Sequence, residues 1–146
     1  AARETGLPLI VHARDADTDT ADILEDEMKN GAFPGLIHCF TAGPELAKRA
    51  LDIGFYISIS GIATFKNAET LRQTILTVPQ DRLLVETDSP YLAPVPHRGK
   101  RNEPSFVADT AGALATLFDT DFETLAARTT DNFYRLFTKA PPRELQ

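Results

Sequence analysis

The sequence has few of the residues that mark several broad classes of protein. Its 146 residues include one cysteine and no tryptophan. No apolar run approaches the roughly 18 residues that a membrane span needs. The single cysteine, Cys39, excludes an internal disulfide and suits a reducing compartment, so we expect a cytoplasmic protein that does not enter membranes. Basic residues are also in the minority, because 15 Lys and Arg stand against 21 Asp and Glu. The net charge of −6 argues against a protein that coats nucleic acid by bulk electrostatics, but it allows an enzyme with a local basic loop.

The rest of the composition is typical of one globular domain. Hydrophobic residues make up 42% of the chain and charged residues 25%, so we predict a single domain over residues 1–146. The sequence begins at Ala1, and its only methionine is Met28. We therefore expect a fragment or a trimmed chain.

Apolar runs of strand length alternate with segments of helical periodicity. The predicted strands are 9–12, 36–40, 55–59 and 83–86, and the predicted helices are 17–30, 44–53, 67–78, 105–118 and 122–137. The strands begin about 20 to 27 residues apart, which is the length of a βα unit. The pattern predicts an α/β fold with a parallel sheet, and four such units amount to half of an eight-stranded barrel. Because four parallel strands alone leave two edges and an uncovered face, we expect the chain to belong to a larger barrel, to pair with another chain, or to be only marginally stable.

Three of these strands end in residues of a type that binds metal ions. His12 and His38 close the first two runs, and Asp88 follows the fourth. The carboxyl ends of parallel strands meet at one edge of the sheet, where α/β folds place their active sites. A lone histidine in such a place more often satisfies a backbone carbonyl, but three equivalent strand ends favour a metal site. Two imidazoles and one carboxylate are a common ligand set for zinc, manganese or iron.

Two neighbours of these candidate ligands have different predicted roles. Glu86 lies two residues before Asp88, and the alternation of a strand places both carboxylates on one face. We interpret Glu86 as a support for the ligands rather than as a ligand. Cys39 follows His38 directly, so it is expected to point to the opposite face and to pack as a small hydrophobic residue.

The loop after Asp88 concentrates positive charge. Its segment PHRGKRNEP, residues 96–104, contains Arg98, Lys100 and Arg101. The planar fork of arginine suits phosphate oxygens, and the glycine lets the backbone approach them closely. A solvated surface loop is the alternative interpretation, but the position beside the predicted metal site favours phosphate binding. Arg14, two residues beyond His12, would lie on the same rim.

Several longer segments resemble a known family. They are LPLIVHARDA, LIHCF, ELAKRALDIGFYISISGI, TFKNAETLR, RLLVETDSPYLAPVPHRGKRNEP and TTDNFYRLF. Over nearly its whole length the chain resembles the TatD family of metal-dependent deoxyribonucleases, and the segment from residue 82 to 104 is the most specific. The resemblance implies a TIM (β/α)8 barrel with one or two divalent ions (Mg, Mn or Zn) at the carboxyl end of its strands. It also implies that His12, His38 and Asp88 are metal ligands, the same residues that the strand ends indicate.

The implied activity is hydrolysis of phosphodiester bonds, with DNA as the substrate. Asp88 would hold the metal and also accept a proton from the attacking water, and Arg98, Lys100 and Arg101 would stabilise charge on the phosphate. The family's early His-x-His pair and a later glutamate do not occur in this sequence. The chain therefore resembles the C-terminal portion of the barrel, and the missing N-terminal half or another copy of the chain would complete the fold. Two alternatives stay open: a metal-dependent hydrolase of an amide or lactone on the same barrel, and an inactive fragment that acts only as an association module.

Overall fold

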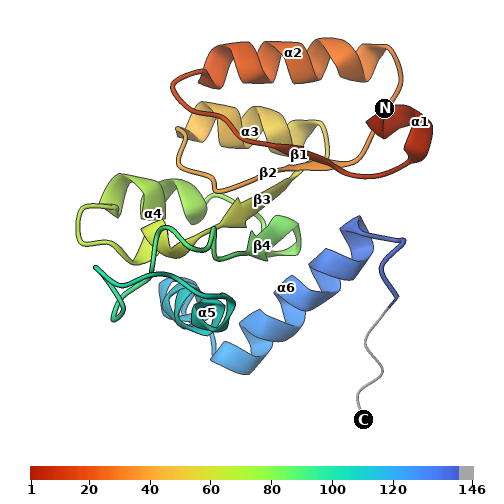
Figure 1. Cartoon of the computed structure of the whole chain (residues 1–146). Helices are drawn as coiled ribbons and strands as arrows, with labels where there is room; N and C mark the ends of the chain where they lie inside the picture. Colours follow the sequence, from red (N-terminus) through yellow and green to blue (C-terminus); the bar gives the residue numbers. More distant parts are fainter. Residues whose placement is uncertain (142–146) are drawn as a thin grey trace.

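A computed structural model describes residues 1–141 of the chain. Helices and strands alternate along it, as the sequence predicts (Figure 1). Their order is α1 (Ala2–Thr5), β1 (Leu9–Val11), α2 (Asp17–Lys29), β2 (Gly35–Ile37), α3 (Pro44–Asp52), β3 (Tyr56–Ile59), η1 (Gly61–Thr64), α4 (Glu69–Ile75), η2 (Gln80–Arg82), β4 (Leu83–Val85), η3 (Pro104–Phe106), α5 (Val107–Leu117) and α6 (Phe122–Leu136), where η denotes a short 3-10 helix.

The strands form one parallel sheet in the order β1-β2-β3-β4, which confirms the predicted α/β class. Each strand is shorter than its predicted range, but the inter-strand hydrogen bonds continue past two of the strand ends. The amide of His38 donates to the carbonyl of Val11 over 2.7 Å, and the amide of Glu86 donates to the carbonyl of Ile59 over 3.0 Å. Both residues are thereby fixed to the carboxyl edge of the sheet.

The five predicted helices are present, with ends displaced by at most three residues. The largest difference is at α4, which ends at Ile75 instead of residue 78. There the amides of Thr77 and Val78 donate to carbonyls only three residues earlier, so the last turn tightens before Pro79. The sequence did not predict α1 or the three 3-10 segments. Such short elements lack the repeated apolar spacing on which a helix prediction depends.

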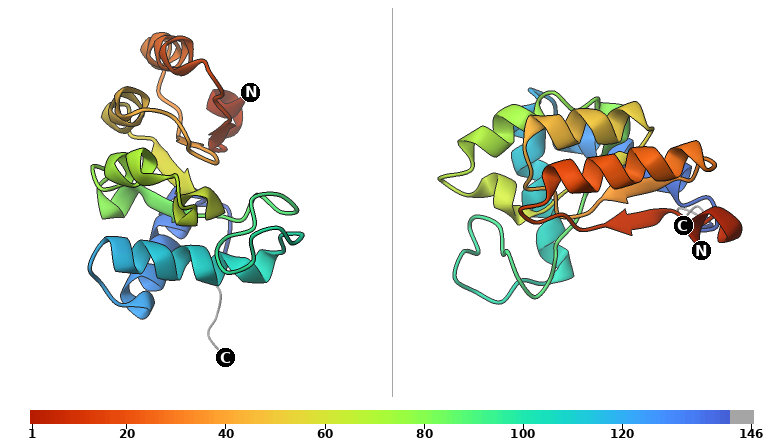
Figure 2. Two further views of the ribbon diagram at one scale, coloured as in Figure 1. Left: turned by 90° about the vertical axis from the view of Figure 1, so that its left-hand side faces the viewer. Right: turned by 90° about the horizontal axis from the view of Figure 1, so that it is seen from above.

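One face of the sheet, which we call the covered face, packs against helices. Its isoleucine side chains, Ile37, Ile57 and Ile59, are at most 1% exposed and join apolar side chains of the surrounding helices in the main core. Helices α2 and α3 lie side by side over β1 and β2 (Figures 1 and 2). Arg49 of α3 links them, because its guanidinium contacts Glu25 of α2 at 2.6 Å and thereby lowers the pKa of that carboxyl.

The opposite face, which we call the open face, is only partly filled. Leu36, Tyr56 and Leu84 pack there against Leu136 at the end of α6. Beside them runs a groove that reaches the carboxyl edge and is lined mainly by Ile10, Leu36, His38, Leu84, Glu86 and Phe133. The side chain of Ile10 on the edge strand β1 is 60% exposed. The uncovered face expected from four parallel strands is therefore present in part.

Helix α6 lies against β4 and is fixed there by a buried amide. The Nδ2 group of Asn132 donates to the carbonyls of Gln80 and Leu83, each over 2.8 Å. None of the described helices is both long and apolar enough to cross a membrane. The prediction of a single domain over residues 1–146 stays a prediction.

Candidate metal centre

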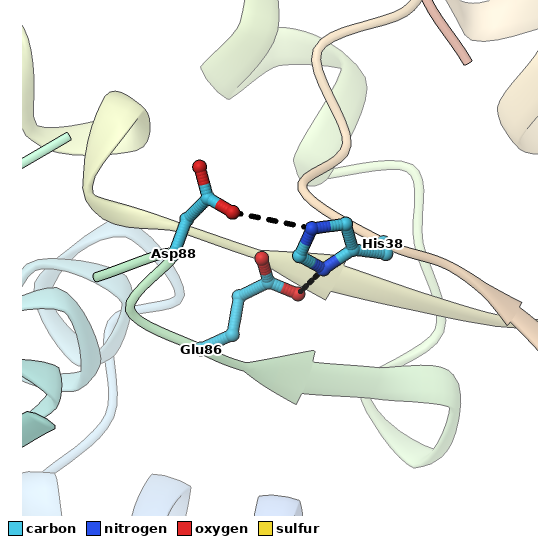
Figure 3. Close-up of side chains that lie close together, drawn as sticks. All are labelled: His38, Glu86 and Asp88. Atoms are coloured by element: carbon cyan, nitrogen blue, oxygen red, sulfur yellow. Dashed lines mark hydrogen bonds and ion pairs between the residues drawn. The ribbon is translucent and has the colours of Figure 1, made fainter. Parts of the chain in front are cut away.

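Three side chains meet at the carboxyl edge of the sheet. His38 follows β2, Glu86 follows β4, and Asp88 lies two residues further along (Figure 3). His38 Nδ1 is 2.9 Å from Glu86 Oε2, and His38 Nε2 is 3.2 Å from Asp88 Oδ1. One ligand-type atom from each residue lies within 4.8 Å of the others. All three side chains are partly buried, Glu86 most deeply at 16% exposure.

The backbone brings Asp88 to this cluster in a way that strand alternation does not describe. Strand β4 ends at Val85, and Asp88 has a φ of 58°, in the left-handed region. Aspartate tolerates that region better than most residues. The turn is closed where the amide of Tyr91 donates to the Asp88 carbonyl over 3.0 Å. The prediction that both carboxylates face the same side is confirmed, but its assumption of a continuous strand through Asp88 is wrong.

Both contacts of His38 are to carboxylate oxygens, and each of these would accept a hydrogen bond from the imidazole ring. A neutral imidazole has one N–H and one lone pair, so it can donate to only one of the two carboxylates. In the tautomer in which Nδ1 donates to Glu86, the Nε2 lone pair and Asp88 Oδ1 face each other at 3.2 Å. Two ligands of a single zinc-sized ion, each about 2.1 Å from it, lie about 3.0 to 3.4 Å apart. The pair His38 Nε2 and Asp88 Oδ1 therefore fits a divalent cation, with Glu86 holding the imidazole.

A second observation points to a cation at the same place. Among the described residues, Glu86 Oε1 is buried without a hydrogen-bond partner. A buried carboxylate oxygen without a donor is costly, and a cation nearby offsets that cost. The donor set also suits a divalent ion, because imidazole nitrogen and carboxylate oxygen are ligands of zinc and manganese.

His12 lies beside the cluster but outside the group of three. Its side chain is exposed, and its ring centroid is 5.9 Å from that of His38. The two rings are tilted by 49° to each other. The structure thus brings the two predicted histidine ligands next to each other at the rim, and the role of His12 as a ligand stays a prediction.

The predicted phosphate-binding residues are in two different situations. Lys100 and Arg101 are exposed and form no ion pair within residues 1–141. Arg98 is held in place, since its guanidinium stacks 3.6 Å from the centroid of the Phe65 ring and donates to the Ala93 carbonyl. Arg14 is exposed at a pocket formed by the loops that follow β1 and β2 and by the first turn of α2. Within residues 1–141, no hydrogen bond or ion pair joins any of the four to the cluster, so their binding roles stay predictions.

Cys39 has no place in the cluster. Its backbone has a φ of 46°, and its buried thiol lies 3.3 Å from the hydroxyl of Ser60. Burial raises the pKa of this thiol, and the charges of Asp88 and Glu86 raise it further. The thiol therefore stays neutral and packs in the interior, in agreement with its predicted role as a small hydrophobic residue.

Sequence reasoning missed Asn102, which is 3% exposed at the end of the basic loop. Its Nδ2 group donates to the carbonyls of Thr87 and Tyr91, on both sides of Asp88. The residue stands among charged neighbours that the sequence indicates to be exposed, so nothing in the local pattern predicts its burial. The loop also lies close to η1, because a Cβ on Gly61 would clash with the Leu92 carbonyl oxygen.

A parallel sheet with a His–Glu–Asp cluster at its carboxyl edge defines a class: α/β proteins of the barrel type with a candidate metal site in the usual position for that fold. The sequence profile of one family within this class, described as "TatD related DNase", matches residues 1–138. The chain belongs to this family.

Relatives and solved structures agree with that assignment. The chain is 58% identical over 135 residues to the "Uncharacterized metal-dependent hydrolase YcfH" of Escherichia coli K12, covering 92% of this chain and 51% of that protein. It is 46% identical over 136 residues to YabD of Bacillus subtilis, also named an uncharacterized metal-dependent hydrolase, covering 93% and 53%. The crystal structure of YJJV, a TatD homolog from Escherichia coli, aligns with a TM-score of 0.85 at 27% identity, over 96% of this chain and 53% of that one. The chain thus spans about half the length of the curated relatives it matches.

Proposed function

We propose that this chain supplies the metal-binding part of a metal-dependent hydrolase that cleaves phosphodiester bonds of DNA. The observation that carries the proposal is the His38–Glu86–Asp88 cluster with its unpaired, buried carboxylate oxygen. The family description and the names of the relatives support the same reading, since they refer to DNases and to metal-dependent hydrolases.

The residues of the cluster would divide the chemistry among them. Glu86 orients the imidazole of His38, which leaves Nε2 to act together with Asp88. Asp88 also has a second carboxylate oxygen, which would accept the proton of an attacking water. A divalent ion, when bound, lowers the pKa of a coordinated water and polarises the phosphoryl oxygen. His12 at the rim is a further ligand in this proposal.

The basic loop would recognise the phosphates. Lys100 and Arg101 are exposed and free to contact a backbone phosphate, and their charge would stabilise the negative charge that develops there. Arg98 keeps one face of its guanidinium on Phe65, so only its outer N–H groups are available. Arg14 would contact the substrate from the rim beside β1.

The open face supports a further part of the proposal. Its groove and the exposed Ile10 on β1 would be covered by additional strands, from a preceding half of a barrel or from another copy of the chain. Only a completed barrel would then be fully active, in a reducing, cytoplasmic location. If the chain acts instead as an association module, it will bind such a partner without any hydrolysis.

The central test measures hydrolysis of a single-stranded DNA oligonucleotide and of a small phosphodiester, with Mg²⁺, Mn²⁺ or Zn²⁺ and with chelator. The wild-type chain is compared with Asp88→Asn, and each is also tested after fusion to a segment that completes the barrel. We expect metal-dependent cleavage that Asp88→Asn abolishes. If the completed wild-type barrel hydrolyses neither substrate, the proposal is contradicted.

The basic loop distinguishes phosphodiester hydrolysis from hydrolysis of an amide or lactone. The double variant Lys100→Ala with Arg101→Ala should raise KM for DNA about tenfold or more and make the reaction less sensitive to salt. Arg98→Ala with Arg101→Ala should act in the same direction. Unchanged turnover of DNA by both variants would show that the phosphate assignment is wrong, and lactone and amide substrates would then be tested.

A further inference from the structure

The basic loop and the acidic turn around Asp88 are joined through one buried side chain, that of Asn102. Its Nδ2 group donates to the Thr87 carbonyl over 2.8 Å and to the Tyr91 carbonyl over 2.5 Å. Its Oδ1 accepts from the amide of Glu103 over 2.9 Å. Its own amide donates to the Pro90 carbonyl over 3.0 Å. All the hydrogen-bonding groups of the side chain are thus used within the polypeptide.

These contacts lie on both sides of the residue that completes the cluster. The Thr87 carbonyl belongs to the peptide group that precedes Asp88, and the orientation of that peptide sets the φ of 58° at Asp88. The Tyr91 residue closes the turn from the other side through its amide, which donates to the Asp88 carbonyl. A left-handed conformation costs a non-glycine residue free energy, so it persists only where surrounding contacts hold it. Asn102 supplies two of those contacts.

The same residue fixes the end of the segment that carries the exposed cations. Lys100 and Arg101 directly precede Asn102, and both are exposed. The other fixed points of the loop lie earlier, where Arg98 stacks on Phe65 and His97 contacts Asp109 at 3.2 Å. Asn102 therefore ties the end of the segment that carries the two exposed cations to the turn at Asp88.

We propose that Asn102 is a positioning residue, which holds the Asp88 carboxylate toward His38 and holds Lys100 and Arg101 at a fixed place relative to it. This inference rests on the proposed metal centre and adds to it a residue that touches neither the metal nor the substrate. Hydrogen-bonded residues that orient metal ligands commonly change metal affinity by about 10-fold to 100-fold when they are removed.

The chain offers a closely matched control for this test. Asn132 is 1% exposed, and its Nδ2 group also donates to two backbone carbonyls, those of Gln80 and Leu83. It fixes α6 to the beginning of β4, so it has no contact with the cluster. Asn102→Ala and Asn132→Ala remove the same chemistry from two places, because each leaves two backbone carbonyls without the amide donor that they share.

The experiment measures Mn²⁺ affinity by titration calorimetry for the wild-type chain and both variants, together with their urea unfolding. We expect Asn102→Ala to weaken Mn²⁺ binding about tenfold or more, and Asn132→Ala to leave it within about twofold at a similar loss of stability. The milder Asn102→Ser, which keeps one donor, should lie between wild type and Asn102→Ala. Equal affinity in wild type and a folded Asn102→Ala, or an equal loss in Asn132→Ala, would overturn the proposal.

A second measurement does not depend on the metal. Amide hydrogen exchange of the metal-free chain should be faster at Tyr91 in Asn102→Ala than in wild type, because the turn that this amide closes loses its support. Asn132→Ala should not change it. Unchanged exchange at Tyr91 in Asn102→Ala would overturn the positioning role. If exchange at Tyr91 becomes faster as expected but the wild-type chain binds no Mn²⁺, the result would instead count against the metal centre.

Discussion

The two faces of the sheet differ although they are built from the same strands. On the covered face, Ile37, Ile57 and Ile59 are at most 1% exposed and pack against helices. On the open face, alternate positions of those strands and of β4 present Ser58 and Leu84, with His38 and Glu86 just beyond the strand ends, along a groove. The comparison shows that the main core, which stabilises the fold, and the candidate metal site lie on opposite faces of one sheet. Substitutions on the two faces should therefore have separable effects.

The largest expected effect is on stability and comes from the covered face. Ile57→Ala should lower the free energy of unfolding by about 2 to 5 kcal/mol, because it leaves a cavity in the main core. The matched change Ile10→Ala, at a side chain that is 60% exposed on the open face, should cost less than about 1 kcal/mol. Urea unfolding of both variants measures the difference. Similar losses would mean that the open face is as well packed as the covered one.

The next effect is on metal affinity and comes from the open side of the carboxyl edge. Asp88→Asn should weaken Mn²⁺ binding by about 100-fold, since it removes the charge of a proposed ligand. Stability should change little, because asparagine also tolerates the left-handed backbone at this position. Asp19→Asn, which makes the same charge change at an exposed position on α2, is the control. Calorimetric titration measures the Mn²⁺ affinity of both variants. An equal loss of affinity in Asp88→Asn and Asp19→Asn would contradict a specific site at Asp88.

A smaller effect is expected where the loop after Asp88 meets η1. Gly61→Ala should destabilise the chain by about 1 to 3 kcal/mol, because the new methyl group would clash with the Leu92 carbonyl oxygen and force the loop away. It should also expose the segment 90–104 to proteolysis. Thermal unfolding and limited digestion measure the two consequences. A variant as stable and as resistant as wild type would show that the loop yields without cost.

The smallest expected effect is a gain on the helical side. Gly112 lies within α5, and a Cβ there would meet no atom within 4 Å. Gly112→Ala should therefore raise the free energy of unfolding by up to about 1 kcal/mol through the higher helix propensity of alanine. Its Mn²⁺ affinity should equal that of wild type when measured by the same titration. A change in affinity would show that the helices and the carboxyl edge are coupled after all.

Local sequence patterns were sufficient for the regular elements and for part of the cluster. Apolar runs located β2, β3 and β4, and the periodicity of residues 122–137 located α6 almost to its ends. The places of His38 and Asp88 after apolar strands predict that they lie at the same edge of the sheet. In the structure His38 Nε2 is 3.2 Å from Asp88 Oδ1. Glu86 was recognised as a neighbour of the site from its spacing. These predictions succeed because strand and helix periods are properties of short segments.

Other features depend on contacts between distant segments. The stacking of Arg98 on Phe65 joins residues 33 positions apart, and the burial of Asn102 depends on carbonyls of the turn after β4. His12 has the same local pattern as His38, yet its side chain is exposed and lies outside the group of three. No pattern of residue types within a single segment contains this information.

By itself, the sequence determined the alternation of strands and helices, the parallel sheet and the edge at which the candidate ligands gather, because these follow from apolar periodicity and from the common direction of the strands. Only the tertiary structure decided which of those side chains share a site. It placed His38 between two carboxylates, turned Asp88 toward it through a left-handed residue, and buried Asn102 beneath the turn. The physical reason is that direction and burial of a side chain beyond a strand end are set by packing from other parts of the chain.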